Sequence, residues 1–121
     1  MAILLKAKPI QEKIIPNLTE RVNKLKIANI VPCLKIILIG EDPASELYTK
    51  NKKLLCEKVG ADCDIIKLPV ETTKKHFQTT LQEIMSDNNV HGCIVQLPLP
   101  DQLKNLNVSN LIDPNKDVDG F

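Results

Sequence analysis

Aromatic side chains are almost missing from this chain, which contains no tryptophan, one tyrosine and two phenylalanines among 121 residues. Large rings usually fill much of a protein interior, so the core must here be built mainly from Ile, Leu and Val. Hydrophobic residues make up 43% of the chain and charged residues 26%, the profile of a soluble globular domain. The length suffices for one domain with a real core, but not for two ordinary ones.

The sequence also lacks the features of several classes of protein. No apolar run approaches the roughly 20 residues of a membrane span, and a net charge of +1 argues against a dedicated nucleic-acid binder. The first eight residues carry no small-residue cleavage site typical of a signal peptide. The four cysteines form no C-x-x-C pair, and Cys56 and Cys93 lie within apolar patterns. We therefore expect reduced structural thiols, no metal site and a cytoplasmic protein.

Strand and helix patterns alternate along the chain. We expect strands at residues 3–5, 34–40, 62–68 and 91–97. We expect helices from Pro9 to about Lys26, over 42–60, from Thr72 or Thr73 to about Ser86, and a shorter one near 103–111. Pro16 should kink or break the first of them. Such alternation predicts an α/β fold, a three-layer αβα domain with a mainly parallel sheet.

The helix expected over residues 42–60 has both of its ends marked. Asp42 suits the N-cap, Pro43 the first helical position, and Gly60 the left-handed residue beyond the end. At 100° per residue, one stripe of this helix should face the core. It comprises Ser45, Tyr48, Lys52, Leu55, Cys56 and Val59.

An inward-facing lysine has two explanations. Either the stem of Lys52 packs on apolar surface and its ammonium reaches water, or Lys52 and Tyr48 form a partly desolvated pair at a cleft. In an open parallel sheet, ligands bind at the carboxyl ends of the strands, where Gly40 and Gln96 each end a strand. The Gln96 amide is either solvated or orients the Lys52 ammonium there.

Three motifs resemble the signatures of one family. They are Gly40-x-x-x-Ala44-Ser45-x-x-Tyr48-x-x-x-Lys52, then Val90-His91-Gly92-x-Ile94-Val95-Gln96-Leu97-Pro98-Leu99-Pro100, then Pro114-x-Lys116-Asp117-Val118-Asp119-Gly120-Phe121. The family is that of the bifunctional methylenetetrahydrofolate dehydrogenase/methenyltetrahydrofolate cyclohydrolases. The resemblance covers essentially the whole chain, but only the amino-terminal, folate-binding half of the family.

The resemblance implies a set of site residues. Lys52 would be the catalytic lysine, supported by Gln96, and the ring of Tyr48 would lie against the folate. Asp119 would bind the pterin, although Asp117 in the same loop could compete for that role or either aspartate could simply form a turn. The remaining substrate-binding residues would be Leu97, Pro98 and Ser45, of which Ser45 could instead only hydrogen-bond the first helical turn.

The implied activity is oxidation of 5,10-methylenetetrahydrofolate with NADP, followed by hydrolysis of the methenyl product to 10-formyltetrahydrofolate. Residues 1–121 would form the folate-binding catalytic domain, and NADP would be bound by a carboxy-terminal domain outside this chain. Tetrahydrofolate derivatives would be the partners, and the full-length protein a homodimer. Two alternatives are a non-catalytic folate- or pterin-binding module and a plain α/β interaction domain.

Overall fold

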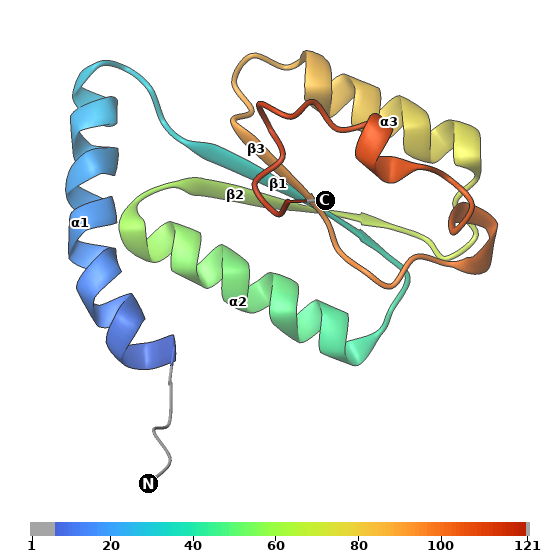
Figure 1. Cartoon of the computed structure of the whole chain (residues 1–121), viewed down its shortest axis with the longest axis horizontal. Helices are drawn as coiled ribbons and strands as arrows, with labels where there is room; N and C mark the ends of the chain where they lie inside the picture. Colours follow the sequence, from blue (N-terminus) through green and yellow to red (C-terminus); the bar gives the residue numbers. More distant parts are fainter. Residues whose placement is uncertain (1–6, 121) are drawn as a thin grey trace, which may run out of the picture.

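The computed structural model describes residues 7–120, so the strand expected at residues 3–5 lies outside the described residues. The elements alternate as expected (Figure 1). They are α1 (Ala7–Ile27), β1 (Cys33–Ile39), α2 (Pro43–Val59), β2 (Asp62–Leu68), α3 (Lys74–Ser86) and β3 (Gly92–Val95), followed by the 3-10 turns η1 (Asp101–Leu103) and η2 (Val108–Asn110).

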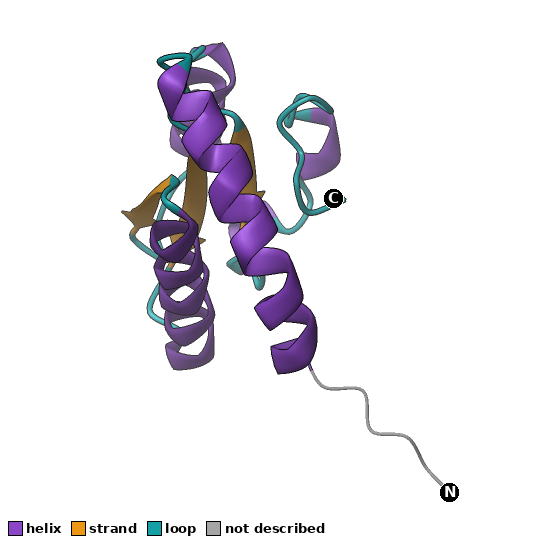
Figure 2. Ribbon diagram, turned by 90° about the vertical axis from the view of Figure 1, so that its left-hand side faces the viewer, coloured by secondary structure: helices purple, strands orange, loops and turns teal. Residues whose placement is uncertain are grey.

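The three strands form a parallel sheet in the order β2-β1-β3, so β1 lies in the centre. One core cluster joins Ile37 and Ile39 of β1 to Phe77 and Leu81 of α3. A smaller cluster on the other face joins Ile36 of β1 to β2, β3 and the α2 side. Figures 1 and 2 show α2 and α3 on opposite sides of the sheet, which confirms the three-layer αβα architecture.

Helix α1 packs beside α2 rather than directly on the sheet. It runs without interruption through Pro16, so the expected break is absent. Proline removes only one backbone donor, and the neighbouring turns of a 21-residue helix keep their own bonds. Thr19 adds a bond from Oγ1 to the carbonyl of Ile15, at 2.8 Å.

Two expectations after α3 need correction. Strand β3 ends at Val95 instead of residue 97, although the Gln96 amide still donates to the carbonyl of Ile37 in β1 at 2.9 Å. The helix expected near residues 103–111 is wrong, since that segment forms η1, a turn and η2. Its apolar residues Leu103, Val108 and Ile112 are buried, as an amphipathic segment requires. Short turns, rather than an α-helix, bring them into the core.

The inward stripe of α2 is only partly as expected. Ser45 and Val59 are buried and Cys56 is half-buried, but Tyr48 is 56% exposed and Leu55 38% exposed. Thr49, which the helical pattern did not single out, is 1% exposed. The buried line therefore follows Ser45, Thr49 and Val59, and the Tyr48 ring lies on its solvent-facing flank.

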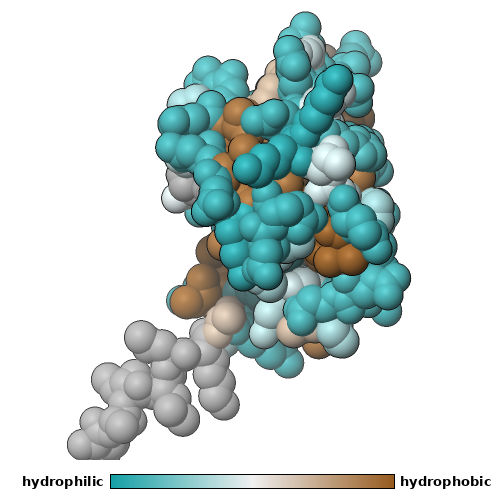
Figure 3. Space-filling view, turned by 90° about the vertical axis from the view of Figure 1, so that its right-hand side faces the viewer, coloured by the Kyte–Doolittle hydropathy of each residue, from teal (hydrophilic) through white to brown (hydrophobic). Residues whose placement is uncertain are grey.

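Within residues 7–120, no helix combines the length and the apolar character that a membrane crossing requires. On the face that Figure 3 shows, hydrophobic residues form separate patches surrounded by hydrophilic ones. Such scattered patches are ordinary for a protein surface.

Candidate active site

The candidate site begins where β1 passes into α2. Gly40 directly follows β1 and has φ 89°, a left-handed conformation that glycine adopts without strain. Asp42 then caps α2 as expected, because its Oδ2 accepts from the amide of Ser45 at 2.9 Å. The Ser45 amide, followed by the Ser45 hydroxyl, lowers the pKa of Asp42 below its ordinary value. These features orient α2 so that Lys52 projects toward the end of β3.

Lys52 and Gln96 meet at this edge of the sheet. The Lys52 Nζ donates to Gln96 Oε1 at 2.8 Å, although the two residues are 44 positions apart in the chain. Both side chains are half-buried. The Gln96 Nε2 donates to the carbonyl of Leu97 at 3.2 Å, which fixes the amide so that its oxygen faces the lysine. The Gln96 amide therefore contacts the Lys52 ammonium rather than being only solvated.

Ser45 connects the start of α2 to the segment after β3. It is only 3% exposed, and its Oγ lies 2.8 Å from Asp42 Oδ2 and 3.3 Å from the carbonyl of Leu97. The single hydroxyl proton is therefore shared between the helix cap and the Leu97 carbonyl. Leu97 and Pro98 themselves are exposed beside this junction. The structure thus brings together Lys52, Gln96, Ser45, Leu97 and Pro98.

Tyr48 lies one helical turn before Lys52, and its ring is largely exposed. A ring in this position is available to a flat ligand, but it does not contribute to the protein core. The inward Lys–Tyr pair expected from the helical stripe is therefore corrected to an inward lysine and an outward ring.

The loop that carries Asp119 runs beside β3. Asp117 forms an isolated parallel bridge with Cys93, and this direction carries Asp119 toward the end of β3 at which Gln96 lies. Asp117 Oδ1 accepts from the amides of Asp119 at 3.1 Å and of Gly120 at 3.0 Å. The Asp119 residue is exposed, and the structure describes no direct contact between its carboxylate and Lys52. Asp117 organises the loop, and Asp119 faces outward.

Two residues of this region have structural roles that the sequence analysis did not predict. Gly92 lies under the loop, and a Cβ there would come within 2.9 Å of Val118 Cγ1. Lys116 extends its ammonium to backbone carbonyls at the end of α3. The only local signal was that both residues belong to the motifs, because their partners are distant in the sequence.

Two cavities lie in this part of the molecule, and neither is lined by both Lys52 and Gln96. The larger, of about 610 Å³, lies at the same edge of the sheet between the ends of β1 and β2 and is lined by Gly40, Glu41 and residues 67–71. Another, of about 480 Å³, is bordered by Lys52, Leu55 and Gln11 of α1. Within residues 7–120 no group of three His, Cys, Asp or Glu side chains could hold a metal ion.

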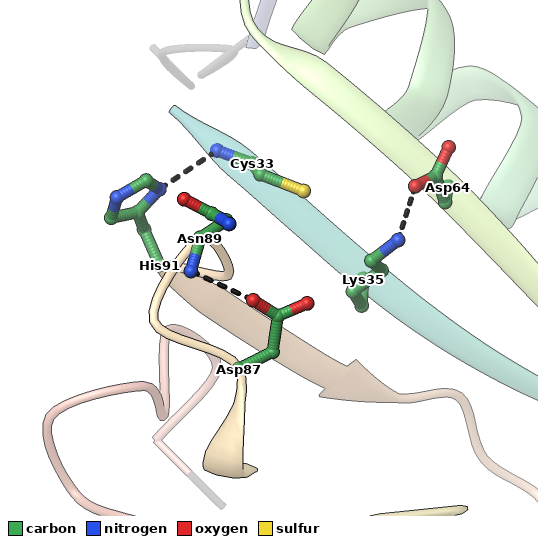
Figure 4. A network of polar contacts seen from close by, with 6 residues as sticks. All are labelled: Cys33, Lys35, Asp64, Asp87, Asn89 and His91. Carbon is green, nitrogen blue, oxygen red and sulfur yellow. Dashed lines mark hydrogen bonds and ion pairs between the residues drawn. The ribbon is translucent and has the colours of Figure 1, made fainter. Parts of the chain in front are cut away.

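A second polar cluster lies at the opposite, amino-terminal edge of the sheet (Figure 4). The amide of Cys33 donates to His91 Nδ1 at 3.1 Å, and Lys35 pairs with Asp64. Burial raises the pKa of the Cys33 thiol, which keeps it in its less reactive protonated form. These contacts join the beginnings of strands and serve the fold.

Comparisons with known proteins show the family of this chain. The family model described as "Tetrahydrofolate dehydrogenase/cyclohydrolase, catalytic domain" matches residues 5–119. The bifunctional protein FolD of Nautilia profundicola is 41% identical over 118 residues, which are 98% of this chain and 42% of that protein.

Two solved structures have a similar fold. One is the bifunctional enzyme FolD, a methylenetetrahydrofolate dehydrogenase/cyclohydrolase from Campylobacter jejuni, with a TM-score of 0.89 and 38% identity over 93% of this chain and 40% of that one. The other is a 5,10-methylenetetrahydrofolate dehydrogenase from the silkworm Bombyx mori, with a TM-score of 0.91 and 32% identity over 99% of this chain and 42% of that one. The chain thus spans less than half the length of these relatives. Because the family model matches nearly all of its residues, the chain belongs to the tetrahydrofolate dehydrogenase/cyclohydrolase family, with the match lying in the catalytic domain.

Proposed function

We propose that this chain is the folate-binding, lysine-bearing part of a bifunctional enzyme of one-carbon metabolism. The enzyme would oxidise 5,10-methylenetetrahydrofolate to the methenyl form with NADP and hydrolyse that product to 10-formyltetrahydrofolate. The observation that carries the proposal is the 2.8 Å bond between Lys52 Nζ and Gln96 Oε1 at the carboxyl ends of the strands, where parallel sheets bind ligands. The proposed substrate contacts are Tyr48, Lys52, Gln96, Leu97, Pro98 and Asp119, with Ser45 behind them.

The hydrolytic half-reaction suits a lysine held in this way. Water adds to the carbon of the cationic methenyl bridge and loses one proton, which leaves a neutral carbinolamine. The bond from that carbon to N5 then breaks as N5 gains a proton, and the added hydroxyl loses its proton to become the formyl carbonyl. Lys52 would transfer these protons, because its side-chain nitrogen can both accept and donate a proton at this position. The Gln96 carbonyl keeps the Lys52 nitrogen in one place throughout.

A carboxylate suits the pterin end of the substrate. The 2-amino group and N3–H of a pterin form a paired donor edge, and one ionised carboxylate can accept both hydrogen bonds. Asp119 is the exposed carboxylate of the loop beside β3, whereas Asp117 already accepts two backbone amides. We therefore assign the pterin to Asp119.

The described residues do not fit a dinucleotide. A pyrophosphate needs a glycine-rich turn with free amides at a helix N-terminus, but the turn after β1 reads Gly40-Glu41-Asp42-Pro43. Asp42 already accepts the amide at the start of α2, and its charge would repel a phosphate. NADP would accordingly be bound by a part of the full-length protein outside these 121 residues. By the same family resemblance, we propose that the full-length protein is a cytoplasmic homodimer.

The experiment is to replace Lys52 by methionine in the full-length protein, with Lys50→Met on the exposed side of the same helix as the control. We expect Lys52→Met to abolish cyclohydrolase turnover while folate affinity stays within about tenfold, or ~1.4 kcal/mol. Lys50→Met should leave both unchanged. Turnover of Lys52→Met within about threefold of wild type would remove Lys52 from the mechanism. Folate binding without turnover in the wild type itself would favour a non-catalytic binding module.

A further inference from the structure

The side chain of Lys116 ends on the backbone of α3. Its Nζ lies 2.7 Å from the carbonyl oxygen of Asp87, 2.9 Å from that of Met85 and 3.3 Å from that of Ile84. The last carbonyls of a helix carry partial negative charge, which an ammonium with three N–H groups complements. The Ile84 and Asp87 carbonyls also accept one backbone amide each. Lys116 is half-buried in this position. It lies 29 to 32 residues away from these partners in sequence, so it ties two separate parts of the chain together.

The backbone of Lys116 is bonded at both of its ends. Its carbonyl accepts from the amide of Cys93 in β3 at 2.8 Å, and its amide donates to the carbonyl of Asp113 at 2.8 Å. Lys116 therefore joins α3, β3 and the loop that comes after η2. The backbone bonds determine how the loop runs along β3, while the side chain determines its position relative to α3.

The residues after Lys116 depend on that anchor. Asp117 accepts the amides of Asp119 and Gly120, so the direction of Asp119 depends on the position of Asp117. Val118 packs over Gly92, which leaves room for it because it has no side chain. The Asp119 carboxylate is thus held through Lys116 and Asp117, without a described side-chain bond of its own.

We propose that Lys116 is a positioning residue for the pterin-binding aspartate: by clamping the end of α3, its ammonium places the loop that presents Asp119 to the substrate. This inference rests on the proposed function, because it takes Asp119 as the pterin ligand. The competing explanation is that Lys116 only stabilises α3. The two explanations differ in whether folate affinity changes beyond what the loss of helix stability causes.

A matched control exists at the other end of α3. Thr73 Oγ1 accepts from the amide of His76 at 3.1 Å, so Thr73→Ala removes a cap of the same helix without touching the loop. The experiment compares Lys116→Met, Thr73→Ala and Asp119→Ala in the full-length protein. Titration calorimetry with a tetrahydrofolate derivative gives the affinity, urea unfolding gives the stability, and hydrogen exchange reports on the amides of Asp119 and Gly120.

We expect Lys116→Met and Thr73→Ala both to lower stability. Only Lys116→Met should raise the folate Kd, by at least about tenfold, with a rise in KM and a much smaller change in kcat. Exchange at the Asp119 and Gly120 amides should accelerate in Lys116→Met and not in Thr73→Ala. If the methionine variant does not fold, Lys116→Gln, which keeps two N–H donors but no charge, should show the same pattern.

The outcomes separate the two levels of the proposal. An unchanged folate Kd in Asp119→Ala would overturn the pterin assignment, and hydrogen exchange would still decide whether Lys116 anchors the loop. A raised Kd in Asp119→Ala together with an unchanged Kd in Lys116→Met would overturn the positioning role alone. Equal increases in Kd for Lys116→Met and Thr73→Ala would reduce Lys116 to a helix cap.

Discussion

Asp117 and Asp119 belong to one short loop, but their carboxylates have different surroundings. Asp117 is half-buried and its Oδ1 accepts two backbone amides, whereas Asp119 is exposed. Asparagine offers one acceptor oxygen, whereas aspartate offers two. Asparagine can therefore replace Asp117, which uses one oxygen to organise the loop, better than it can replace Asp119, whose carboxylate would accept two donors from the ligand. Substitution by asparagine at each position therefore tests the assignment of roles.

We predict that Asp119→Asn weakens folate binding by at least about tenfold, because a buried donor left unpaired typically costs ~1–3 kcal/mol. Asp117→Asn should leave affinity nearly unchanged, and Asp117→Ala should mainly lower stability. In alanine variants, Asp119→Ala should weaken folate binding more than Asp117→Ala does. Calorimetric titration and urea unfolding of the full-length protein measure both quantities. Equal losses of affinity at the two positions would refute Asp119 as the pterin ligand.

Strand β3 and the loop from Lys116 to Gly120 approach each other closely at one glycine. A Cβ on Gly92 would lie 2.9 Å from Val118 Cγ1 and 3.3 Å from Leu34 Cδ1. Leu34 belongs to β1 and has little freedom to move, whereas Val118 is 58% exposed and can move outward. The loop, rather than the sheet, should therefore give way to a larger side chain.

We predict that Gly92→Ala lowers the free energy of unfolding by ~1–3 kcal/mol, the usual cost of overpacking, and also weakens folate binding. Adding Val118→Ala removes the clashing methyl groups, so the double variant should recover most of the lost affinity. A double-mutant cycle measures this coupling. Strictly additive effects of the two substitutions on folate affinity would show that Gly92 and Val118 are not energetically coupled.

The buried thiols link the stability of the whole domain to alkaline pH. Burial first, and then the neighbouring Cys56 thiol, raises the pKa of Cys63 from 9.0 to about 12. Burial likewise raises the pKa of Cys93 to about 11. The folded state thus holds these protons more tightly than the unfolded chain, so the stabilisation is complete below about pH 9 and is lost as the pH rises through these values.

We predict that urea unfolding midpoints fall between about pH 8 and about pH 10.5, and that the fall is smaller in a Cys63→Ala, Cys93→Ala double variant. The comparison with the variant matters because lysines also titrate in this range. An identical pH dependence in the two proteins would show that the thiols contribute nothing. At about pH 8 the same thiols should react slowly with alkylating reagents in the native protein.

We predict that the 121-residue chain, expressed alone, does not oxidise methylenetetrahydrofolate with NADP or NAD. The turn after β1 contains two carboxylates, and the Asp42 carboxylate already accepts the amide of Ser45 in the first turn of α2. The near-ultraviolet absorbance of reduced nicotinamide measures this activity, because hydride transfer converts the oxidised cofactor to the absorbing form. A signal from the purified chain that persists after removal of contaminating enzyme would contradict the prediction.

Local patterns predicted most of the elements. The caps of α2 at Asp42 and Gly60 are confirmed, since capping depends on residues within one turn of each helix end. The central strand was recognisable from an unbroken β-branched run, and the parallel three-layer order could be inferred from alternation of strands and helices. The candidate site residues were proposed from motifs, and the meeting of Gly40 and Gln96 at one edge was predictable from parallel topology alone.

Packing between distant segments determined the orientation of α2 and the side-chain contacts at the candidate site. No helical wheel could place Thr49 inside and Tyr48 outside, because that choice depends on how α2 rotates against the sheet. The same holds for the contact of Lys52 with Gln96 and for the three carbonyls that Lys116 reaches, which join residues about 30 or more positions apart. Spacing within a segment is visible in a sequence, whereas distances between segments arise only when the chain folds and its core closes.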